Sequence, residues 1–338
     1  MRKLLLLIAA GVVLLGSSCK NDLDINAPWK ETLVVFGLLN SVENTHYVRI
    51  SKAFLGEGDA IEFAGIYDSI NVNPSLLEVT VEEYVNEQLT RTFGLTADSG
   101  FAKDPGIFSA PAQIIYKFET PQNQGLLSNA TYVLRAKNTS SGLEIRAETD
   151  MVGQIILSQP GAFLTEYGLT PQAKTTLKIK SAENGKLYES FVYFIYREYP
   201  LNNPSDIVSK EIKINLGRLT RENVNSGETF NMEVGNKEIY QTLANNMVAS
   251  TSENQLVRIA DSIRFEVNAV TEEVQVYLSV NEPSNSLAQE RPEYSNIENG
   301  IGIFSSRGSM KRTYYLNDNT VDSLRSNNIT QNLNFLPR

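Results

Sequence analysis

The sequence of 338 residues contains one cysteine, one histidine and one tryptophan, and this scarcity excludes several kinds of chemistry. Zinc sites draw on several cysteine or histidine ligands, so single residues of each type exclude a structural or catalytic zinc. A serine–histidine–carboxylate triad would have to be built around His46, and the motif G-x-S-x-G is missing as well. Val48 and Ile50 share the strand phase of His46, so we expect this histidine in the core or at a strand edge. We expect Trp29 to pack at the entrance of the first strand.

Long hydrophobic runs are also scarce, since the only one lies at the N-terminus, over residues 4–15. About a dozen apolar residues make a signal-peptide core, whereas a membrane-spanning helix needs about 20. Two basic residues precede the run, and the small residues 16–18 follow it, directly before Cys19. This order is that of a secretory signal peptide that ends where a lipoprotein signal peptidase cuts. We predict that residues 1–18 are removed and that Cys19 becomes the lipidated N-terminus of the mature chain.

An ordinary secretory leader with an incidental cysteine is the alternative, because Gly16 stands where lipoprotein sites usually have leucine. Looser sites of this kind resemble those of Bacteroidetes-type lipoproteins. One acyl chain binds a bilayer only marginally, so stable anchoring needs the several chains of a triacylated cysteine. Residues 19–30 are polar and are expected to form a tether. Their start, Lys20-Asn21-Asp22, resembles the export signal of some Bacteroidetes lipoproteins, so both the cell surface and the periplasmic face of the outer membrane stay open.

The charge of the chain is acidic, and loss of the two basic residues of the leader shifts the formal net charge from −9 to −11. Nucleic acid requires a basic face, so no nucleic-acid partner is expected. With Cys19 lipidated, no thiol or disulfide remains, and the fold must be held by burial alone. A mature chain of 320 residues with ordinary hydrophobic content is large enough for two domains.

Alternation of apolar and polar residues, which is typical of a sheet wetted on one face, runs through nearly all of the mature chain. The turn residues 138–142 make residues 131–149 a predicted hairpin. Asn184-Gly185 predicts a second tight turn, and the strand 191–196 that follows is apolar on both faces, so we expect it to be central and covered. The full set of predicted strands covers residues 47–51, 77–82, 132–137, 143–148, 177–180, 191–196, 212–216, 263–269 and 274–280.

These strands predict an all-β protein of two β-sandwich domains, immunoglobulin- or fibronectin-like, with one or two short peripheral helices. We place the domains at residues 31–155 and 170–338. Three long segments, 55–75, 97–112 and 281–299, are rich in glycine, proline, asparagine and serine. Loops of this length in a compact domain often carry function, so a binding surface is expected there.

Two short helices are predicted from capping residues and apolar spacing. Asn236 can cap a segment in which an apolar residue recurs every fourth position over residues 239–247. Asn319 can cap a second helix over residues 320–326.

Carboxylates are too plentiful to single out a catalytic pair. Glu82-Glu83 and Glu272-Glu273 are adjacent in predicted strands, so their side chains should point to opposite faces. Glu57, Asp59 and Glu62 could hold calcium through oxygen ligands, although a solvated acidic loop explains them better. No metal or other cofactor is expected.

Two motifs resemble ligand-binding fingerprints and are better explained by structure. Asn317-Asp318-Asn319 begins like a calcium loop but lacks its glycine and its distal glutamate, so helix capping explains it. The segment 300–305, G-I-G-I-F-S, lacks the third glycine and the helix of a dinucleotide site. We therefore expect Gly300 and Gly302 to mark a tight backbone approach within a strand.

The segment S-N-I-E-N-G-I-G-I-F, within residues 294–307, resembles the ending of a large, uncharacterised group of Bacteroidetes lipoproteins that is labelled a domain of unknown function. The opening L-V-V-F-G-L-L at residues 33–39 and the hairpin at 132–149 are similar to that group too. Its members are often encoded beside TonB-dependent outer-membrane transporters. The resemblance therefore implies an accessory role in nutrient uptake and brings over one functional residue, the lipidation site Cys19.

Together these features predict an outer-membrane lipoprotein that binds a ligand or partner and catalyses no reaction. The expected partner is a TonB-dependent transporter, and the expected cargo a glycan, a peptide or a metal complex. A surface adhesin or fimbria-like protein, which would assemble by strand donation, stays open. So does a carboxylate-dependent glycan hydrolase, which would need two acids about 5–9.5 Å apart.

Overall fold

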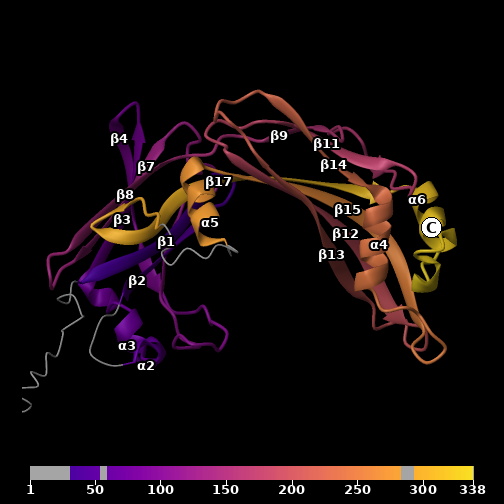
Figure 1. Cartoon of the computed structure of the whole chain (residues 1–338), viewed down its shortest axis with the longest axis horizontal. Coiled ribbons are helices and arrows are strands. Elements are labelled where there is room, and N and C mark those ends of the chain that lie inside the picture. Colours follow the sequence, from indigo (N-terminus) through magenta and orange to yellow (C-terminus); the bar gives the residue numbers. More distant parts are fainter. Residues whose placement is uncertain (1–30, 54–58, 283–292, 338) are drawn as a thin grey trace, which may run out of the picture.

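The computed structural model describes residues 31–53, 59–282 and 293–337. Cys19, Trp29, Glu57 and the predicted tether lie outside the described residues, so the expectations placed on them stay predictions. Three β-sheets and a few short helices make up the described chain, which confirms the predicted all-β, sandwich-like fold (Figure 1).

A nine-stranded sheet runs through the whole molecule. Its strands, in spatial order, are β13 (Val208–Thr220), β12 (Leu187–Pro200), β15 (Leu256–Val270), β17 (Gly300–Leu316), β1 (Thr32–Asn40), β2 (Thr45–Ala53), β6 (Ile115–Glu119) and β5 (Thr96–Asp98), with β10 (Glu166–Tyr167) beside β17. A five-stranded sheet consists of β16 (Ile297–Glu298), β8 (Glu144–Asp150), β7 (Thr131–Asn138), β3 (Leu77–Val85) and β4 (Gln88–Gly94). A three-stranded sheet consists of β14 (Thr229–Gly235), β11 (Lys174–Lys180) and β9 (Ile156–Gln159).

Short helices flank these sheets. They are α2 (Ala60–Gly65), α3 (Tyr67–Ile70), α4 (Asn236–Asn246), α5 (Glu272–Asn281) and α6 (Asp318–Ser326), with short 3-10 turns at Pro74–Leu76 and Gln331–Leu333. Figure 1 shows α2 and α3 at one end of the molecule and α6 at the other.

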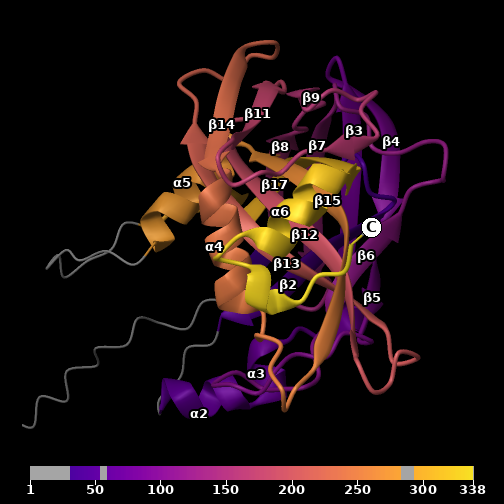
Figure 2. The same ribbon diagram turned by 90° about the vertical axis from the view of Figure 1, so that its right-hand side faces the viewer.

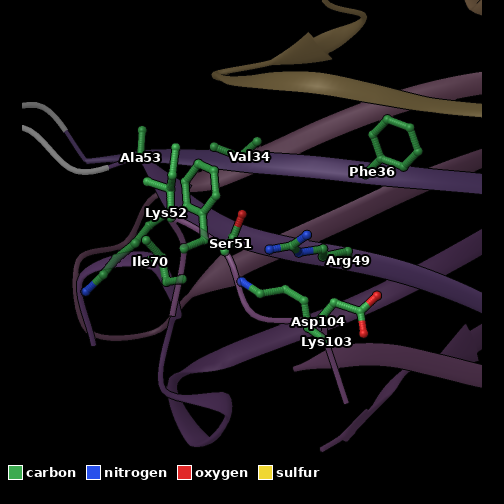
Figure 3. A pocket seen from close by; sticks show the side chains of 12 residues that line it. Val34, Phe36, Arg49, Ser51, Lys52, Ala53, Ile70, Lys103 and Asp104 are labelled. Atoms are coloured by element: carbon green, nitrogen blue, oxygen red, sulfur yellow. The ribbon is translucent and has the colours of Figure 1, made fainter. Parts of the chain in front are cut away.

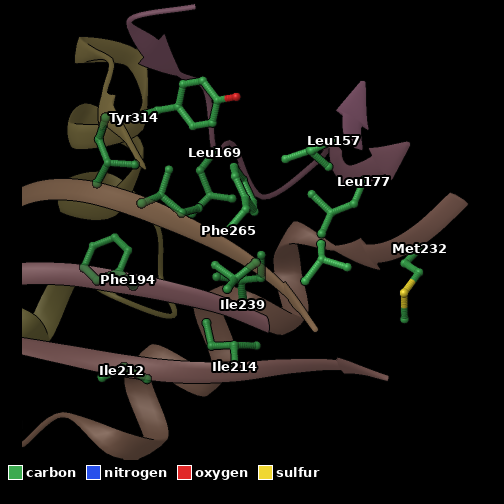
Figure 4. Close-up of a cluster of buried hydrophobic side chains, with 14 of the residues drawn as sticks. Leu157, Leu169, Leu177, Phe194, Ile212, Ile214, Met232, Ile239, Phe265 and Tyr314 are labelled. Carbon is green, nitrogen blue, oxygen red and sulfur yellow. The ribbon is translucent and has the colours of Figure 1, made fainter. Parts of the chain in front are cut away.

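The large sheet is shared by two sandwiches, each with its own core. In the N-terminal sandwich, inward side chains of β1, β2 and β6 pack on the five-stranded sheet. In the C-terminal sandwich, side chains of β12, β13, β15 and β17 face α4 and the three-stranded sheet (Figure 4). Residues labelled there include Phe194, Ile212, Ile214, Phe265 and Tyr314 from the large sheet and Leu157, Leu177, Met232 and Ile239 opposite them.

Strand β17 joins the two sandwiches. Its first half pairs in parallel with β1, from Gly300 opposite Leu33 onward, and its second half pairs antiparallel with β15. The N-terminal core therefore includes Phe304, which comes from a part of the sequence far from the rest of that core.

The glycines of β17 permit a close approach to β1. Gly302 has φ +113°, and a Cβ atom there would lie 2.0 Å from the carbonyl oxygen of Val35. A Cβ atom at Gly300 would lie 2.9 Å from the carbonyl oxygen of Leu33. The tight backbone approach predicted for these two glycines is confirmed.

The same face of β17 is turned to both cores. Phe304 belongs to the N-terminal core, and Tyr314 and Leu316, an even number of residues further on, belong to the C-terminal core. Ile301 and Lys311, in the opposite phase, are exposed. The outer surfaces of both sandwiches thus lie on the same face of the nine-stranded sheet, here called the open face. Between them, Ile303 and Ser305 of β17 are in the same phase but buried.

The hairpin predicted at residues 131–149 is confirmed, since β7 and β8 pair antiparallel across it. The turn at Asn184-Gly185 also forms, with Asn184 at φ 59°. However, β11 before it pairs with β9 and β14, whereas β12 after it pairs with β13 and β15. The turn therefore carries the chain from one sheet to the other rather than closing a hairpin.

The strand predicted over residues 274–280 is wrong, because this segment forms α5. Its valines and leucine alternate, but Glu272 and Glu273 precede them and suit the positive end of a helix dipole. These two glutamates therefore lie in the first turn of a helix and not on opposite faces of a strand. The ring of Tyr277 contacts Phe36 of β1, with centroids 6.0 Å apart, so α5 covers part of the open face. Figure 2 shows α5 on the side of the molecule away from β4.

Both predicted helices exist, but neither predicted cap is correct. Helix α4 begins after Gly235, and the side chain of Asn236 instead accepts a buried hydrogen bond from Thr175 Oγ1 at 2.8 Å. Helix α6 begins after Asn317, whose side-chain oxygen accepts from the backbone N–H of Thr320 at 3.0 Å. The capping interpretation of the segment 317–319 holds, with the cap two residues earlier than expected.

Candidate functional site

A pocket of about 570 Å³ lies on the open face over β1 and β2 (Figure 3). This volume falls within the range of about 300–1,000 Å³ that is usual for small-molecule sites. The pocket is lined by Val34, Phe36, Arg49, Ser51, Lys52, Ala53, Ile70, Lys103, Asp104, Gly106, Ile107 and Phe108.

The floor of the pocket follows from strand alternation. Leu33 and Val35 point into the core, so Val34 and Phe36 must point outward. In the antiparallel register with β2, Phe36 lies opposite Arg49. The sheet therefore presents an aromatic ring and a guanidinium side by side to the pocket.

The loop over residues 99–114 forms the opposite wall and is tied to its neighbours. The backbone N–H of Lys103 donates to the carbonyl of Pro111 at 2.9 Å, which closes the loop on itself. The backbone N–H of Ser109 donates to the carbonyl of Ala64 in α2 at 2.8 Å. At the base of the loop, Phe101 packs edge-on against a β2 tyrosine, with ring centroids 5.3 Å apart. The loop thus holds Lys103 and its neighbours over the strands.

The electrostatics of the pocket are dominated by cations. Arg49, Lys52 and Lys103 line it together with one carboxylate, Asp104. Among the described residues, no carboxylate lies within ion-pair distance of any of the three cations. Burial, and secondarily the charge of Arg49, lower the pKa of Lys103.

The pocket also exposes large apolar side chains. Ile107 is 64% exposed, Phe108 is 52% exposed and Phe36 is 48% exposed. The ammonium of Lys103 lies 5.6 Å from the centroid of the Phe108 ring. A contiguous apolar surface beside fixed polar groups is typical of a ligand site.

His46 is buried, as predicted for a core histidine. It is 2% exposed, its ring stacks on Phe118 with centroids 4.8 Å apart, and neither ring nitrogen has a hydrogen-bond partner among the described residues. Burial lowers the pKa of His46 to about 4. The ring is therefore neutral near pH 7 and takes no part in the pocket.

The acidic pair in β3 splits between the two faces of the strand, as predicted. Glu83 is buried and accepts hydrogen bonds from Tyr132 Oη at 2.6 Å, Thr90 Oγ1 at 2.8 Å and Arg91 Nε at 2.7 Å. Burial alone would raise the pKa of Glu83, but these hydrogen bonds and the charge of Arg91 outweigh it and lower the pKa to about 2. Glu82 pairs with Arg135 on the other face. Glu83 therefore forms a structural ion pair with Arg91.

The predicted calcium loop is only partly described. Asp59 caps α2 by accepting from the backbone N–H of Ile61 at 2.8 Å, and Glu62 lies in the same helix, whereas Glu57 lies outside the described residues. In the described ranges, no group of three or more histidine, cysteine, aspartate or glutamate side chains is placed to hold a metal. None of the helices in those ranges is long and apolar enough to cross a membrane.

The sequence pointed to the loops that line the pocket but did not identify the side chains of the strands that form its floor. The segments 97–112 and 55–75 were expected to carry a binding surface, and they supply Lys103 to Phe108 and Ile70. Arg49 was missed, although its place in the outward phase of a strand was visible in the alternation. Whether such a cation is paired depends on its cross-strand and loop neighbours, which alternation does not reveal.

Comparisons with known proteins assign no relative. No family model matches the chain, and no curated protein is similar to it. Two structures of alpha-2-macroglobulin from Escherichia coli, one activated by porcine elastase and one by trypsin, are each 12% identical with a TM-score of 0.19. The overlap covers 86% and 87% of this chain and 20% and 16% of those chains. The chain spans a fifth or less of those proteins, and a likeness this weak assigns neither fold nor function.

Proposed function

We propose that this protein is an outer-membrane lipoprotein that binds a small ligand without transforming it and delivers it to a TonB-dependent transporter. The observation that carries the binding role is the pocket on the open face, where apolar side chains converge with cations that have no carboxylate partner in the described part of the chain. The leader and Cys19 support the anchor, and the resemblance to transporter-linked lipoproteins supports the partner.

A binding role is supported over hydrolysis by the chemistry of the pocket. A glycan hydrolase needs two carboxylates flanking its substrate, and the lining of this pocket contains one, Asp104, among the residues that the structure describes. A role in strand exchange is less well supported, since the edge strand β13 carries Lys210, Lys213 and Arg218. Charged side chains on an edge strand discourage the addition of a further strand.

The anchor can be tested by metabolic labelling with palmitate in the native host. We expect label on the wild-type protein and on Ser18→Ala, which keeps a small residue before the cut, and none on Cys19→Ala. Absence of label on the wild-type protein contradicts the anchor. Protease treatment of intact cells then separates the cell surface from the periplasmic face.

The binding role can be tested by a thermal-shift screen of glycans, peptides, organic acids and metal complexes against the mature protein. We expect one class to stabilise the wild-type protein but not the pocket variant Phe36→Ser/Phe108→Ser. Phe163→Ser is the matched control, because Phe163 is fully exposed and lies outside the pocket. A ligand that stabilises all three proteins equally contradicts the proposed site, and co-purification of a transporter with the wild-type protein tests the partner.

A further inference from the structure

We infer that the pocket over β1 and β2 binds a small organic anion with an apolar or aromatic body, its anionic group held between Arg49 and Lys103. The inference rests on the proposed binding function and names the class of ligand. It is drawn from three features: the pairing of charges on the open face, the apolar walls, and the direction of the pocket's side chains.

Most cations of the C-terminal half of the open face contact a protein partner. Lys213, which has no carboxylate partner among the described residues, lies 3.7 Å from the centroid of the Phe191 ring. In the C-terminal sandwich three cations each meet a carboxylate: Arg197 with Asp261 at 3.3 Å, Arg264 with Glu211 at 2.9 Å and Lys311 with Glu266 at 3.5 Å. Arg49 and Lys103 of the pocket have no such partner among the described residues. Among the described residues, the two cations of the pocket thus lack a carboxylate partner at a place where the surface is hollowed.

The lone carboxylate of the pocket does not neutralise these cations. Figure 3 shows the amino group of Lys103 and the guanidinium of Arg49 directed to the same region, while the carboxylate of Asp104 points away from both. Lys103 and Asp104 are neighbours in the chain, so their side chains leave the backbone in different directions. An anion between Arg49 and Lys103 would therefore meet two donors and little opposing charge.

Burial, and secondarily the nearby charge of Arg49, disfavour the protonated amine and lower the pKa of Lys103. A bound anion would offset the repulsion between the two cations. The apolar side chains Val34, Phe36 and Phe108 could cover the body of the same ligand, and Phe36 and Phe108 offer ring faces or edges to an aromatic group. A bare inorganic anion would leave these apolar walls unused.

Two fluorescent probes separate the contribution of the ligand's anionic group from that of its apolar body. Anilinonaphthalene sulfonate carries an aromatic body and one anionic group, and phenyl-naphthylamine is the same ring system without the sulfonate. We expect the mature protein to bind the sulfonate at least about tenfold more tightly than the neutral probe, since one charge-assisted contact can supply that factor. Inorganic phosphate is expected not to displace either probe.

Charge-neutralising variants then locate the anion. In Arg49→Gln/Lys103→Gln we expect the affinity for the sulfonate probe to fall at least about tenfold, with a change of less than about twofold for the neutral probe. Lys213→Gln/Arg264→Gln removes two cations from the other half of the same sheet face and is expected to leave both affinities unchanged. Far-ultraviolet circular dichroism checks that each variant keeps its strand content.

The outcomes distinguish the ligand class from the binding function. Equal affinity for the two probes, or equal losses in both double variants, overturns the inference of an organic anion while the pocket still binds the neutral probe. Displacement by phosphate alone overturns it as well, because the apolar body would then be dispensable. If neither probe responds to the variant Phe36→Ser/Phe108→Ser, the proposed binding function fails together with the inference.

Discussion

The two halves of the open face belong to one continuous sheet, yet they present different surfaces. In the C-terminal half, Arg264 lies over the Tyr193 ring at 4.2 Å and Lys213 over the Phe191 ring at 3.7 Å, so cations shield the aromatic side chains from water. In the N-terminal half, Phe36 and Phe108 are about half exposed and Arg49 has no carboxylate partner among the described residues. The cations of the C-terminal half contact carboxylates or aromatic rings of the protein, whereas the N-terminal half presents exposed apolar side chains beside Arg49.

This difference suggests that the two halves of one sheet surface have different roles, solubility in the C-terminal half and ligand binding in the N-terminal half. Paired charges on an exposed strand surface keep it soluble and contribute little free energy each. Cations that have no carboxylate partner among the described residues and lie beside exposed apolar groups add little stability to the free protein, so we explain their arrangement by what they bind. The predictions below probe each half of the molecule, beginning with the largest expected effect.

The buried ion pairs of the two sandwiches differ in depth, and we expect their removal to differ accordingly. Arg258 is 1% exposed, donates to Glu198 Oε2 at 2.9 Å and also holds the carbonyls of Leu333 and Val248. Arg91, the partner of Glu83, is 25% exposed. Arg258→Met should therefore reduce the free energy of unfolding by about 3–5 kcal/mol, because it leaves two carbonyl groups without their donor and leaves Glu198 with Lys210 as its remaining cation.

Arg91→Met is the matched comparison and should cost clearly less, since water can reach its site. Urea denaturation of both variants measures the two losses. Equal losses would show that the depth of burial does not distinguish the two pairs.

The join between the halves depends on Gly302. Gly302→Ala would place a methyl group against the Val35 carbonyl in a positive-φ conformation, and we expect a loss of about 3 kcal/mol. Gly94→Ala is the control, because Gly94 lies at a sheet edge with open space around it. Thermal unfolding by circular dichroism compares them. A Gly302→Ala protein as stable as Gly94→Ala would contradict the close pairing of β17 with β1.

The core of the N-terminal half should respond to mild acid through His46. Its pKa is about 4 in the folded protein and about 6.5 in the unfolded chain, so the unfolded state takes up the proton first. The stability that His46 contributes is complete above pH 6.5 and is lost as the pH falls toward 4. At pH 5 we expect a loss of about 2 kcal/mol relative to pH 7.

His46→Phe removes this loss while keeping a ring against Phe118. Urea denaturation of both proteins at pH 7 and pH 5 measures the difference between their pH dependences. Glu83, whose pKa is about 2, should act in a separate window, since its contribution is present above pH 4.5 and is lost as the pH falls through 2. Identical pH dependence of the wild type and His46→Phe would show that His46 is not held neutral by burial.

The smallest effect is expected on the C-terminal half of the open face. Arg264→Gln removes an exposed ion pair with Glu211 and a cation–ring contact with Tyr193, and should cost less than about 1 kcal/mol. Urea denaturation at low and high salt measures it. A loss above about 2 kcal/mol would mean that this surface is part of the stability of the fold, which would weaken the contrast between the halves.

The sequence pattern predicted those features of the fold that depend on residues close together in the chain. The alternation predicted that His46 points inward, and the turn residues predicted the hairpin of β7 and β8. Two glycines with one residue between them predicted a close backbone approach inside a strand. The composition of the loops pointed to the region where the pocket lies. Each of these features is set by residues close together in the sequence.

Features set by distant partners could not be predicted in this way. Alternation in β17 and β1 does not say that the two strands pair in parallel, because every strand of this type has the same signal. The segment of α5 alternates like a strand, and only its acidic first turn favoured a helix. Arg49 and Arg264 are both outward arginines in strands. Glu211, which neutralises Arg264, comes from another strand, and no carboxylate of the described chain does the same for Arg49.

The central claim is that the N-terminal half of the open face is the binding half, and a crystal structure of the mature protein with anilinonaphthalene sulfonate tests it most directly. We predict that the rings lie against Phe36 and Phe108 and that the sulfonate lies within hydrogen-bond distance of Arg49 or Lys103. A probe bound instead over Phe191 and Tyr193, in the C-terminal half, would contradict the account.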